Sequence, residues 1–216
     1  MKGKKKSLVD IWGKTFSARS SRNEFLIVLA ILVVALFTLS NFLLFNELRK
    51  GATLDDPFLK QFAPVDVTWI TFLIIYSGLI IAITYLIKKP DLLILAFLSY
   101  AITAFFRIAA MYSLPLNAPE NIIPLNDPFV QLFGSGNILL KDLFFSGHTS
   151  TLFLIYLVIT EKKVKNIFLF LTIAVAFCVL IQHVHYTIDV IAAPFFAYSS
   201  FILSRKILAF IRDFLQ

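Results

Sequence analysis

Long apolar stretches constrain this chain more than any other feature. Of its 216 residues, 59% are hydrophobic, whereas a soluble globular domain is nearer to about 45–50% apolar. A transmembrane helix needs roughly 20 apolar residues to cross about 30 Å of hydrocarbon. Stretches of about that length occur at residues 25–45, 68–87, 92–112, 144–160, 166–184 and 187–204. We therefore predict an all-α integral membrane protein, a bundle of six transmembrane helices that forms one domain over residues 1–216.

The two ends of the chain flank this predicted bundle. Residues 1–23 are basic, and the apolar stretch after them is longer than the core of a signal peptide and lacks a small-residue cleavage site. We therefore expect residues 25–45 to be a transmembrane helix that follows a basic cytoplasmic N-terminus. Residues 205–216 have the charge spacing of an amphipathic helix at the membrane surface, or they extend the sixth span as a cytoplasmic tail.

Lysine and arginine are distributed unequally between the two sides of the predicted bundle. Fifteen of them lie in the N-terminus, in the turns at 88–91 and 161–165, and in the tail, against four on the other side. Cytoplasmic loops carry this excess in membrane proteins, so both termini are predicted to be cytoplasmic. Orientation and contact with anionic lipid then account for the net charge of +7, and we expect no nucleic-acid partner.

The longest connection, residues 113–143, falls on the exoplasmic side in this topology. It contains four prolines and the run Gly134-Ser135-Gly136. These residues disfavour a continuous helix, so we predict an irregular lid loop. A single cysteine, Cys178, excludes an internal disulfide and leaves the redox compartment open.

Two short polar clusters interrupt the apolar sequence. One is Ser146-Gly147-His148-Thr149, and the other is His185-Tyr186-Thr187-Ile188-Asp189. A titratable residue is costly within a membrane span and therefore indicates a functional site. The predicted topology brings both clusters, together with Arg107 of the third span, to the exoplasmic ends of their helices. The charge count that set the topology used none of the residues in the two clusters.

The chemistry of these groups suits phosphoryl transfer. Residues four apart face the same way on a helix, so Asp189 would fix the tautomer of His185 and leave its other nitrogen basic. Ser146 and Gly147 stand at a predicted helix start, where backbone N–H groups favour an anion. His148 beside them could protonate a leaving oxygen, and Arg107 could stabilise charge on a phosphoryl group.

Other interpretations of these residues remain open. His183 is two residues from His185, points elsewhere on a helix, and is expected to be structural. Arg107 could extend to the outer head groups, and Asp189 could pair with an arginine or line a transport path. A zinc site from His148, His185 and Asp189 is chemically possible. The phosphohistidine chemistry favoured here needs no metal, so we expect neither a metal nor a cofactor.

The segments FFSGHTSTLFLIYL and HYTIDV resemble the two signature motifs of the sphingomyelin synthase-related branch of the type 2 phosphatidic acid phosphatase (PAP2) superfamily. The segment from Arg107 through Met111-Tyr112 to Pro115 is similar to a third motif, at the end of that family's third span. The resemblance implies six helices and a site open to the exoplasmic leaflet, with Tyr112 beside the substrate phosphate.

The resemblance also implies roles for individual residues. His185 would be the nucleophile that forms a phosphohistidine intermediate, Asp189 its activator, and His148 the acid and base at the leaving and attacking hydroxyls. Asp142 matches the aspartate of a Gly-Asp motif, although Lys141 stands in place of the glycine. As an alternative, Asp142 is an ordinary carboxylate of an exposed loop.

Ordinary lipid phosphatases of this superfamily carry additional basic residues that the chain lacks. Cys178-Val179 stand where those enzymes have Ser-Arg, and there is no Lys-x6-Arg-Pro motif. A phosphodiester carries one negative charge and a phosphomonoester nearly two, so a site poor in Arg and Lys favours a diester.

We therefore expect a lipid phosphotransferase that moves a phospho-head group from a phospholipid donor to a lipid-alcohol acceptor, ceramide or diacylglycerol. One alternative is a lipid phosphatase or phospholipase C-like hydrolase with water as acceptor, and a second is a small non-enzymatic transporter. The compact chain, rich in Phe, Ile and Lys, favours a bacterial inner membrane. The head group, acceptor and oligomeric state are not predicted.

Overall fold

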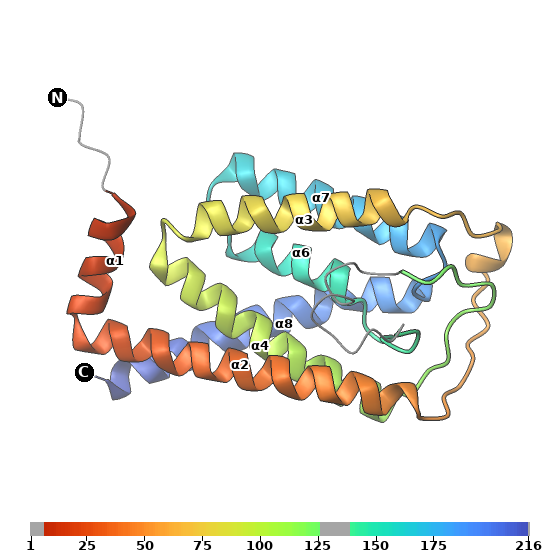
Figure 1. Ribbon diagram of the computed structural model, residues 1–216, viewed down its shortest axis with the longest axis horizontal. Helices are drawn as coiled ribbons and strands as arrows, with labels where there is room; N and C mark the ends of the chain where they lie inside the picture. The colour runs from red at the N-terminus through yellow and green to blue at the C-terminus, as the bar shows by residue number, and fades with distance from the viewer. Residues whose placement is uncertain (1–6, 126–138, 216) are drawn as a thin grey trace.

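The computed structural model of the chain describes residues 7–125 and 139–215. Within these residues the regular structure is helical. The elements are α1 (Leu8–Ser17), α2 (Arg19–Glu47), the short 3-10 helix η1 (Leu59–Gln61), α3 (Thr68–Leu86), α4 (Pro90–Ser113), α6 (Gly147–Val158), α7 (Lys162–Ile181) and α8 (Thr187–Phe214). From α2 onward the long helices lie side by side and alternate in direction, so both chain termini lie at one end of the bundle (Figure 1).

Five helices in the described residues, α2, α3, α4, α7 and α8, are long and apolar enough to cross a membrane. The chain is therefore an all-helical protein of the multi-pass membrane type. The predicted span at 144–160 corresponds to α6, which has only 12 residues. At 1.5 Å per residue α6 measures about 18 Å. It is shorter than the hydrocarbon layer, and the predicted count of six full spans is not confirmed.

The ends of the bundle differ from the sequence expectation in two respects. The region up to residue 23, predicted only as a basic segment, contains the 10-residue helix α1, which crosses the end of the bundle at a steep angle to α2 (Figure 1). The tail from residue 205 continues α8 to Phe214, so the second of the two predicted alternatives is the observed one.

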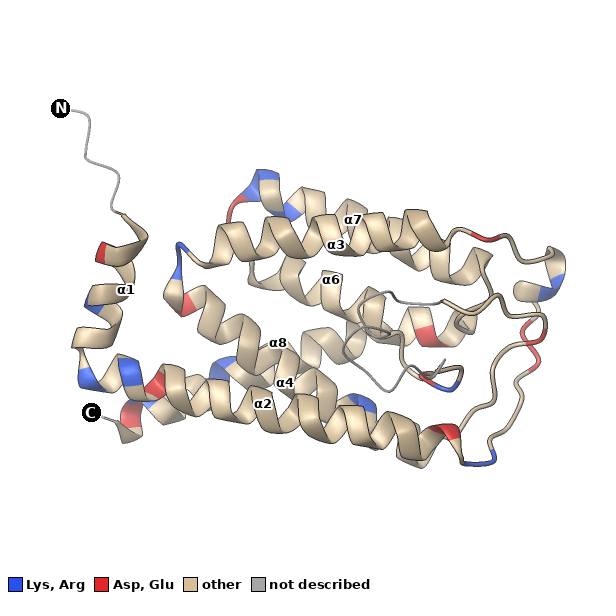
Figure 2. Ribbon diagram, in the orientation of Figure 1, with Lys and Arg blue, Asp and Glu red and all other residues tan. Residues whose placement is uncertain are grey.

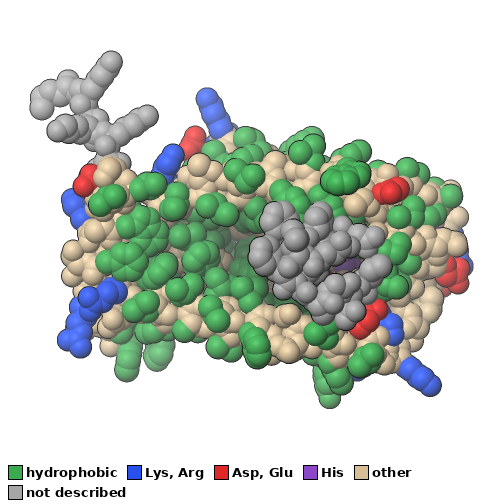
Figure 3. Space-filling view, in the orientation of Figure 1, with side chains coloured by type: hydrophobic (Ala, Val, Ile, Leu, Met, Phe, Trp, Pro, Cys, Tyr) green, Lys and Arg blue, Asp and Glu red, His purple; other side chains and the backbone are tan. Residues whose placement is uncertain are grey.

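Helix α4 is the central element of the bundle. Half of its most apolar 18-residue window is buried, against 17% of the corresponding window of α2. It packs against α2 and α8, and small side chains such as Ala35 and Ala101 allow close approach at the α2–α4 contact. Hydrophobic side chains are spread along the length of the molecule on the face in Figure 3, as contact with lipid requires.

Two loops meet at the end of the bundle opposite the termini. Ala52 and Leu116 form an isolated parallel bridge, in which Ala52 N–H donates to the Pro115 carbonyl at 2.9 Å. Gly51 permits this approach, because a Cβ atom there would lie 2.4 Å from the Leu116 carbonyl carbon. Residues 114–125 are irregular apart from this bridge, and a role as a lid stays a prediction. The predicted Gly134-Ser135-Gly136 run lies outside the described residues.

Candidate active site

His185 and Asp189 form a buried pair at the start of α8. The distance from His185 Nδ1 to Asp189 Oδ2 is 3.3 Å, and the two side chains are 3% and 0% exposed. The sequence interpretation placed both residues on one helical face. In the structure α8 begins only at Thr187, so His185 precedes the helix. The contact arises because Asp189, in the first turn, reaches back: its Oδ2 also accepts the Tyr186 N–H at 3.1 Å.

This arrangement defines which nitrogen of His185 is available for chemistry. A carboxylate accepts hydrogen bonds, so Nδ1 carries the proton and Nε2 retains its lone pair. The same carboxylate is fixed by the helix start that it caps. The orientation of the imidazole therefore depends on the local folding of α8.

The other polar cluster forms the start of α6. Ser146 Oγ caps this helix by accepting the Thr149 N–H at 3.4 Å. Ser146 N–H donates in turn to the Asp189 carbonyl at 3.1 Å, which joins the start of α6 directly to the first turn of α8. His148 is the second residue of α6, where free N–H groups point outward. The two clusters thus lie together, although the two histidines are 37 positions apart in the sequence.

Arg107 lies in α4 and is paired with Asp142 through Nη2 and Oδ1. Its guanidinium is packed against the start of α6, because a Cβ atom on Gly147 would lie 2.6 Å from Arg107 Nη1. Burial raises the pKa of Asp142, but the charge of Arg107, their hydrogen bond, and the charges of His185 and His148 hold that pKa below its ordinary value. Asp142 is therefore a member of the cluster and its side chain is only 30% exposed.

Tyr112 and His183 lie in other environments. The Tyr112 side chain is 62% exposed, and its ring faces the Arg49 guanidinium with 5.0 Å between the Arg49 Cζ and the ring centroid. His183 is 4% exposed and follows α7 with a left-handed φ of 56°. Its Nδ1 lies 3.3 Å from the Glu120 carbonyl oxygen. His183 thus joins the link between α7 and α8 to the loop after α4.

Asp56 is a supporting residue that the sequence interpretation missed. Its Oδ2 accepts the Thr187 N–H at 2.7 Å, and its Oδ1 accepts the Thr187 hydroxyl at 3.1 Å and the N–H groups of Phe58 and Leu59. It therefore caps α8 from a loop more than 130 residues away in sequence. No local pattern reveals such a contact, although an aspartate before a Pro-Phe pair is a turn signal.

The C-terminal end of α2 supports the segment that carries Asp142. Glu47 Oε2 accepts the N–H groups of Leu140 and Lys141 at 3.1 and 3.0 Å. Asn46 Nδ2 donates to the Lys141 carbonyl at 2.8 Å. These contacts also place Lys141, which departs from the glycine of the family motif: its Nζ donates to the Arg49 carbonyl at 2.5 Å.

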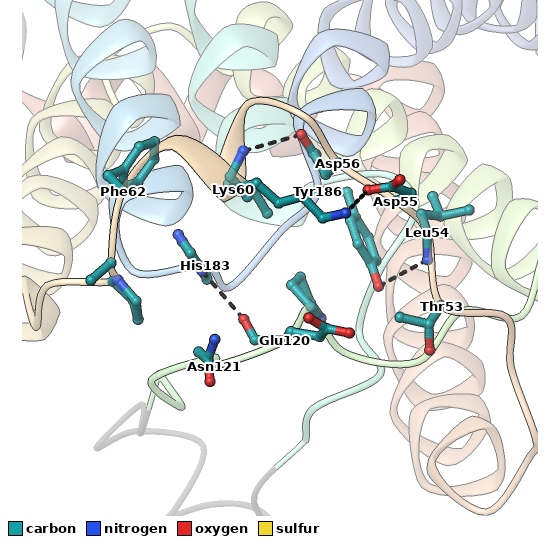
Figure 4. Close-up of a pocket in the computed structure, with 14 residues that line it drawn as sticks. Thr53, Leu54, Asp55, Asp56, Lys60, Phe62, Glu120, Asn121, His183 and Tyr186 are labelled. Atoms are coloured by element: carbon teal, nitrogen blue, oxygen red, sulfur yellow. Dashed lines mark hydrogen bonds and ion pairs between the residues drawn. The ribbon is translucent and has the colours of Figure 1, made fainter.

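A cavity of about 580 Å³ lies beside the candidate site, between the loop that contains residues 53–64 and residues 119–121 (Figure 4). His183 and Tyr186 contribute to its wall. The Tyr186 hydroxyl accepts the Leu54 N–H at 3.2 Å and donates to the Asn117 carbonyl at 3.1 Å. Three carboxylates, Asp55, Asp56 and Glu120, and one amine, Lys60, line the cavity. Within residues 7–125 and 139–215, no three His, Cys, Asp or Glu side chains are arranged to hold a metal ion.

Comparison with known proteins gives the relatives of this chain. Residues 141–206 match the family described as PAP2 superfamily C-terminal. The human phosphatidylcholine:ceramide cholinephosphotransferase 2 is 44% identical over 63 residues, which cover 26% of this chain and 17% of the human protein. The Macaca fascicularis protein of the same name is 43% identical over 63 residues, with the same coverage. No solved structure matches the chain significantly.

The matched family segment contains both histidine clusters, with α6, α7 and most of α8 between and around them. It also contains Asp142, whereas Arg107 and Tyr112 lie before it. The aligned part is a minor share of each curated relative, 17% of its length. The similarity is therefore confined to this C-terminal segment, which resembles the PAP2 superfamily C-terminal family and part of the two cholinephosphotransferases.

Proposed function

We propose that this protein is a lipid phosphotransferase that moves a phospho-head group from a glycerophospholipid to a lipid alcohol. The observation that carries this proposal is the buried His185–Asp189 pair, whose helix start is hydrogen-bonded to the start of α6 beside His148. A nucleophile, the carboxylate that orients it and a candidate acid thus come from elements that contact one another. The similarity to cholinephosphotransferases supports the same conclusion.

In the first half-reaction, His185 Nε2 attacks the phosphorus of the donor. A P–N bond forms, the P–O bond to diacylglycerol breaks, and His148 donates a proton to the departing oxygen. Asp189 stabilises the positive charge that develops on the His185 ring. The N–H groups at the start of α6 and the Arg107 guanidinium face the negative charge on the phosphoryl oxygens.

In the second half-reaction, the hydroxyl of ceramide or diacylglycerol attacks the same phosphorus. His148 now accepts the hydroxyl proton, a new P–O bond forms, and the P–N bond breaks to release neutral His185. Each enzyme group returns to its starting protonation state. With water in place of the lipid alcohol, the same steps would hydrolyse the donor.

The charge balance of the site supports a diester substrate. Arg107 is the cation of α4 in the cluster, and its charge is opposed by Asp142. A phosphomonoester with nearly two negative charges would need additional cations to replace its hydration. One net negative charge on a diester is the better match to the paired arginine and the histidines.

The cavity in Figure 4 supports a donor whose head group is cationic. Its three carboxylates exceed its single lysine, so an ammonium group is favoured there over an anionic group. Aromatic side chains beside it, Phe62 and Tyr186, can also contact a cation. Choline and ethanolamine phospholipids are therefore the proposed donors.

Purified protein in mixed micelles provides the test. We expect radiolabelled phosphatidylcholine or phosphatidylethanolamine to transfer its head group to added ceramide or diacylglycerol, and phosphatidylglycerol to be a poor donor. His185→Ala should abolish transfer, and Asp213→Asn, at an exposed carboxylate near the far end of α8, should retain it. Release of free phosphocholine without either acceptor product would support the hydrolase, and full transfer by His185→Ala would exclude the proposed nucleophile.

The proposed location is a bacterial inner membrane with both termini in the cytoplasm. The termini, the α3–α4 turn and the start of α7 lie at one end of the bundle, and most of the basic side chains gather there (Figure 2). This distribution supports the orientation inferred from the positive-inside rule. The candidate site is at the other end, in contact with the exoplasmic leaflet.

A further inference from the structure

Helix α1 has its own start signal. Ser7 Oγ accepts the Asp10 N–H at 3.1 Å, and Asp10 Oδ2 accepts the Ser7 N–H at 3.1 Å, which forms a reciprocal capping box. Such a box satisfies two N–H groups that would otherwise lack partners. The helix is therefore specified locally, although it is only 10 residues long.

One face of α1 is apolar and attaches the helix to the bundle. Leu8, Ile11, Trp12 and Phe16 have the spacing of a single helical stripe. Trp12 Nε1 donates to the Ile87 carbonyl of the α3–α4 turn at 2.9 Å. The Trp12 ring also lies 5.5 Å from those of Phe16 and Phe25, measured between centroids. These contacts hold α1 across the end of the bundle (Figure 1).

The bundle covers this apolar face incompletely. No residue of α1 is fully buried. The side chains of Leu8 and Phe16 are 43% and 37% exposed, and that of Val9 is 81% exposed. A helix that lies across a membrane-spanning bundle would place such side chains at the boundary between acyl chains and head groups.

The cations next to this face lack a close ion-pair partner in the described residues, although the charge of Asp10 acts on Lys14 from a greater distance. Lys14 of α1, and Arg19 and Arg22 in the first turn of α2, are exposed. None of the three forms an ion pair with a carboxylate in the described part of the chain. They lie at the end of the bundle where basic side chains gather (Figure 2). Anionic lipid head groups would supply negative charge at this end of the bundle.

We propose that α1 is an interfacial helix that binds anionic phospholipid head groups. Its apolar face contacts the outer part of the acyl chains, and Lys14, Arg19 and Arg22 contact the phosphates. Trp12 fixes the depth of the helix through its bond to the α3–α4 turn. This inference is independent of the proposed enzymatic function.

Lipid-specific quenching of Trp12 fluorescence tests this proposal. The chain contains two tryptophans, so Trp69→Phe leaves Trp12 as the sole reporter. This variant is reconstituted in bilayers of phosphatidylcholine and phosphatidylglycerol, with bromine on the acyl chains of one lipid at a time. We expect brominated phosphatidylglycerol to be enriched around Trp12 roughly fivefold or more over brominated phosphatidylcholine, since each surface cation contributes about 1 kcal/mol.

Charge reversal provides the control. The triple variant Lys14→Glu/Arg19→Glu/Arg22→Glu should abolish the enrichment of phosphatidylglycerol around Trp12, while brominated phosphatidylcholine should still quench Trp12. The control Lys50→Glu, at the opposite end of the bundle, should leave the enrichment unchanged. High salt should reduce the enrichment of phosphatidylglycerol around Trp12 in the protein with unaltered α1. This measurement tests the proposal even if the triple variant does not fold. Equal quenching by both lipids at low salt, or quenching by neither, would overturn the proposal.

Discussion

At the scale of single residues, the candidate site depends on a carboxylate that has two tasks. Asp189 Oδ2 caps the start of α8 through the Tyr186 N–H and also holds the Nδ1 proton of His185. The second oxygen, Oδ1, is buried and forms no hydrogen bond with any of the residues that the structure describes. Burying the Asp189 carboxylate in this environment costs desolvation free energy. The interaction of its charge with the His185 ring is a reason for an aspartate at this position.

Asp189→Asn tests that charge. The amide keeps the size of the side chain and can still cap α8 through its oxygen, but it cannot stabilise a cationic His185 ring. We expect kcat for head-group transfer to fall by about 10²–10⁴-fold with a much smaller change in thermal stability. Asp213→Asn, an exposed carboxylate at the other end of α8, is the matched control. Equal turnover in both variants would contradict the role assigned to Asp189.

The close approach of Arg107 to Gly147 gives a second test at this scale. In Gly147→Ala the new methyl group would meet the guanidinium, at 2.6 Å from Nη1, and displace it from Asp142. The smaller head of lysine leaves more room, so Arg107→Lys should harm the Gly147→Ala enzyme less than the unaltered one. A double-mutant cycle on kcat/KM should therefore give a coupling of about 0.5–3 kcal/mol. Strict additivity would show that the two residues act independently.

At the scale of elements, loops distant in sequence hold the reacting residues in place. Asp56 caps α8 from the loop after α2, while Glu47 holds the segment that carries Asp142. Arg49 adds contacts to the end of α4, because its guanidinium donates to the carbonyls of Met111 and Tyr112 at 3.2 and 3.0 Å. The end of α2 and the following loop thus contact the end of α4, the segment that carries Asp142 and the start of α8.

Asp56 makes the attachment of α8 sensitive to acid. Burial raises the pKa of Asp56, but the hydrogen bonds from Thr187, Leu59 and Phe58 outweigh burial and hold that pKa below its ordinary value. The folded state therefore favours the carboxylate. Its contribution to stability is complete above the unfolded value of about 3.9 and is lost as the pH falls through the lower folded value.

Asp56→Asn should lower the stability at neutral pH by about 1–3 kcal/mol, because amide hydrogens would face bound N–H groups. The difference in unfolding midpoint between the unaltered protein and this variant should shrink as the pH is lowered through that window. Thermal unfolding in detergent, followed by circular dichroism, measures it. Asp55→Asn is the control: Asp55 is 76% exposed and pairs with Lys60 at the surface, so its loss should have little effect. A difference that grows in acid would contradict the assignment.

The sequence predicted the helices of the bundle better than it predicted the contacts between distant residues. Residue ranges of α3 and α4 follow from apolar length, because a helix in lipid must satisfy its own backbone groups. The partnership of His185 with Asp189 was also predicted, but from helical spacing, whereas the structure forms it through a helix cap. The amphipathic α1 was missed because its start signal, Ser7 and Asp10, was read as part of a basic segment. The supporting roles of Asp56 and Glu47 could not be predicted from the sequence, because their hydrogen-bond partners are distant in sequence and come close only in the folded protein.

At the scale of the whole molecule, the two ends of the bundle carry different groups of residues. One end holds the termini, α1 and most basic side chains (Figure 2). The other holds the loops, the cavity and the candidate site (Figure 4). A salt-bridge cluster closes the first end: Arg212 of α8 contacts Glu24 of α2 at 2.9 Å and Asp91 of α4 at 3.3 Å.

The proposed orientation predicts which end is accessible from outside the cell. The single cysteine is buried, so Cys178→Ser provides a background for introduced thiols. In this background Lys50→Cys should react with a membrane-impermeant maleimide in intact cells. Lys88→Cys, in the α3–α4 turn, should react only after permeabilisation. The reverse pattern would place the candidate site on the cytoplasmic side.

The shortness of α6 has a consequence for how a substrate reaches the protein. If the end of α6 at Val158 lies near the cytoplasmic boundary, its first turn stops about 18 Å away, roughly 12 Å short of the opposite boundary of a 30 Å hydrocarbon layer. His148 then stands below the level at which phospholipid phosphates normally rest. A donor lipid would have to sink toward the midplane, and the hydroxyl of a ceramide or diacylglycerol, which rests at the polar boundary, would have to follow it. Both substrates would therefore have to be displaced along the bundle axis, or the bilayer would have to thin beside α6, before they reach His148.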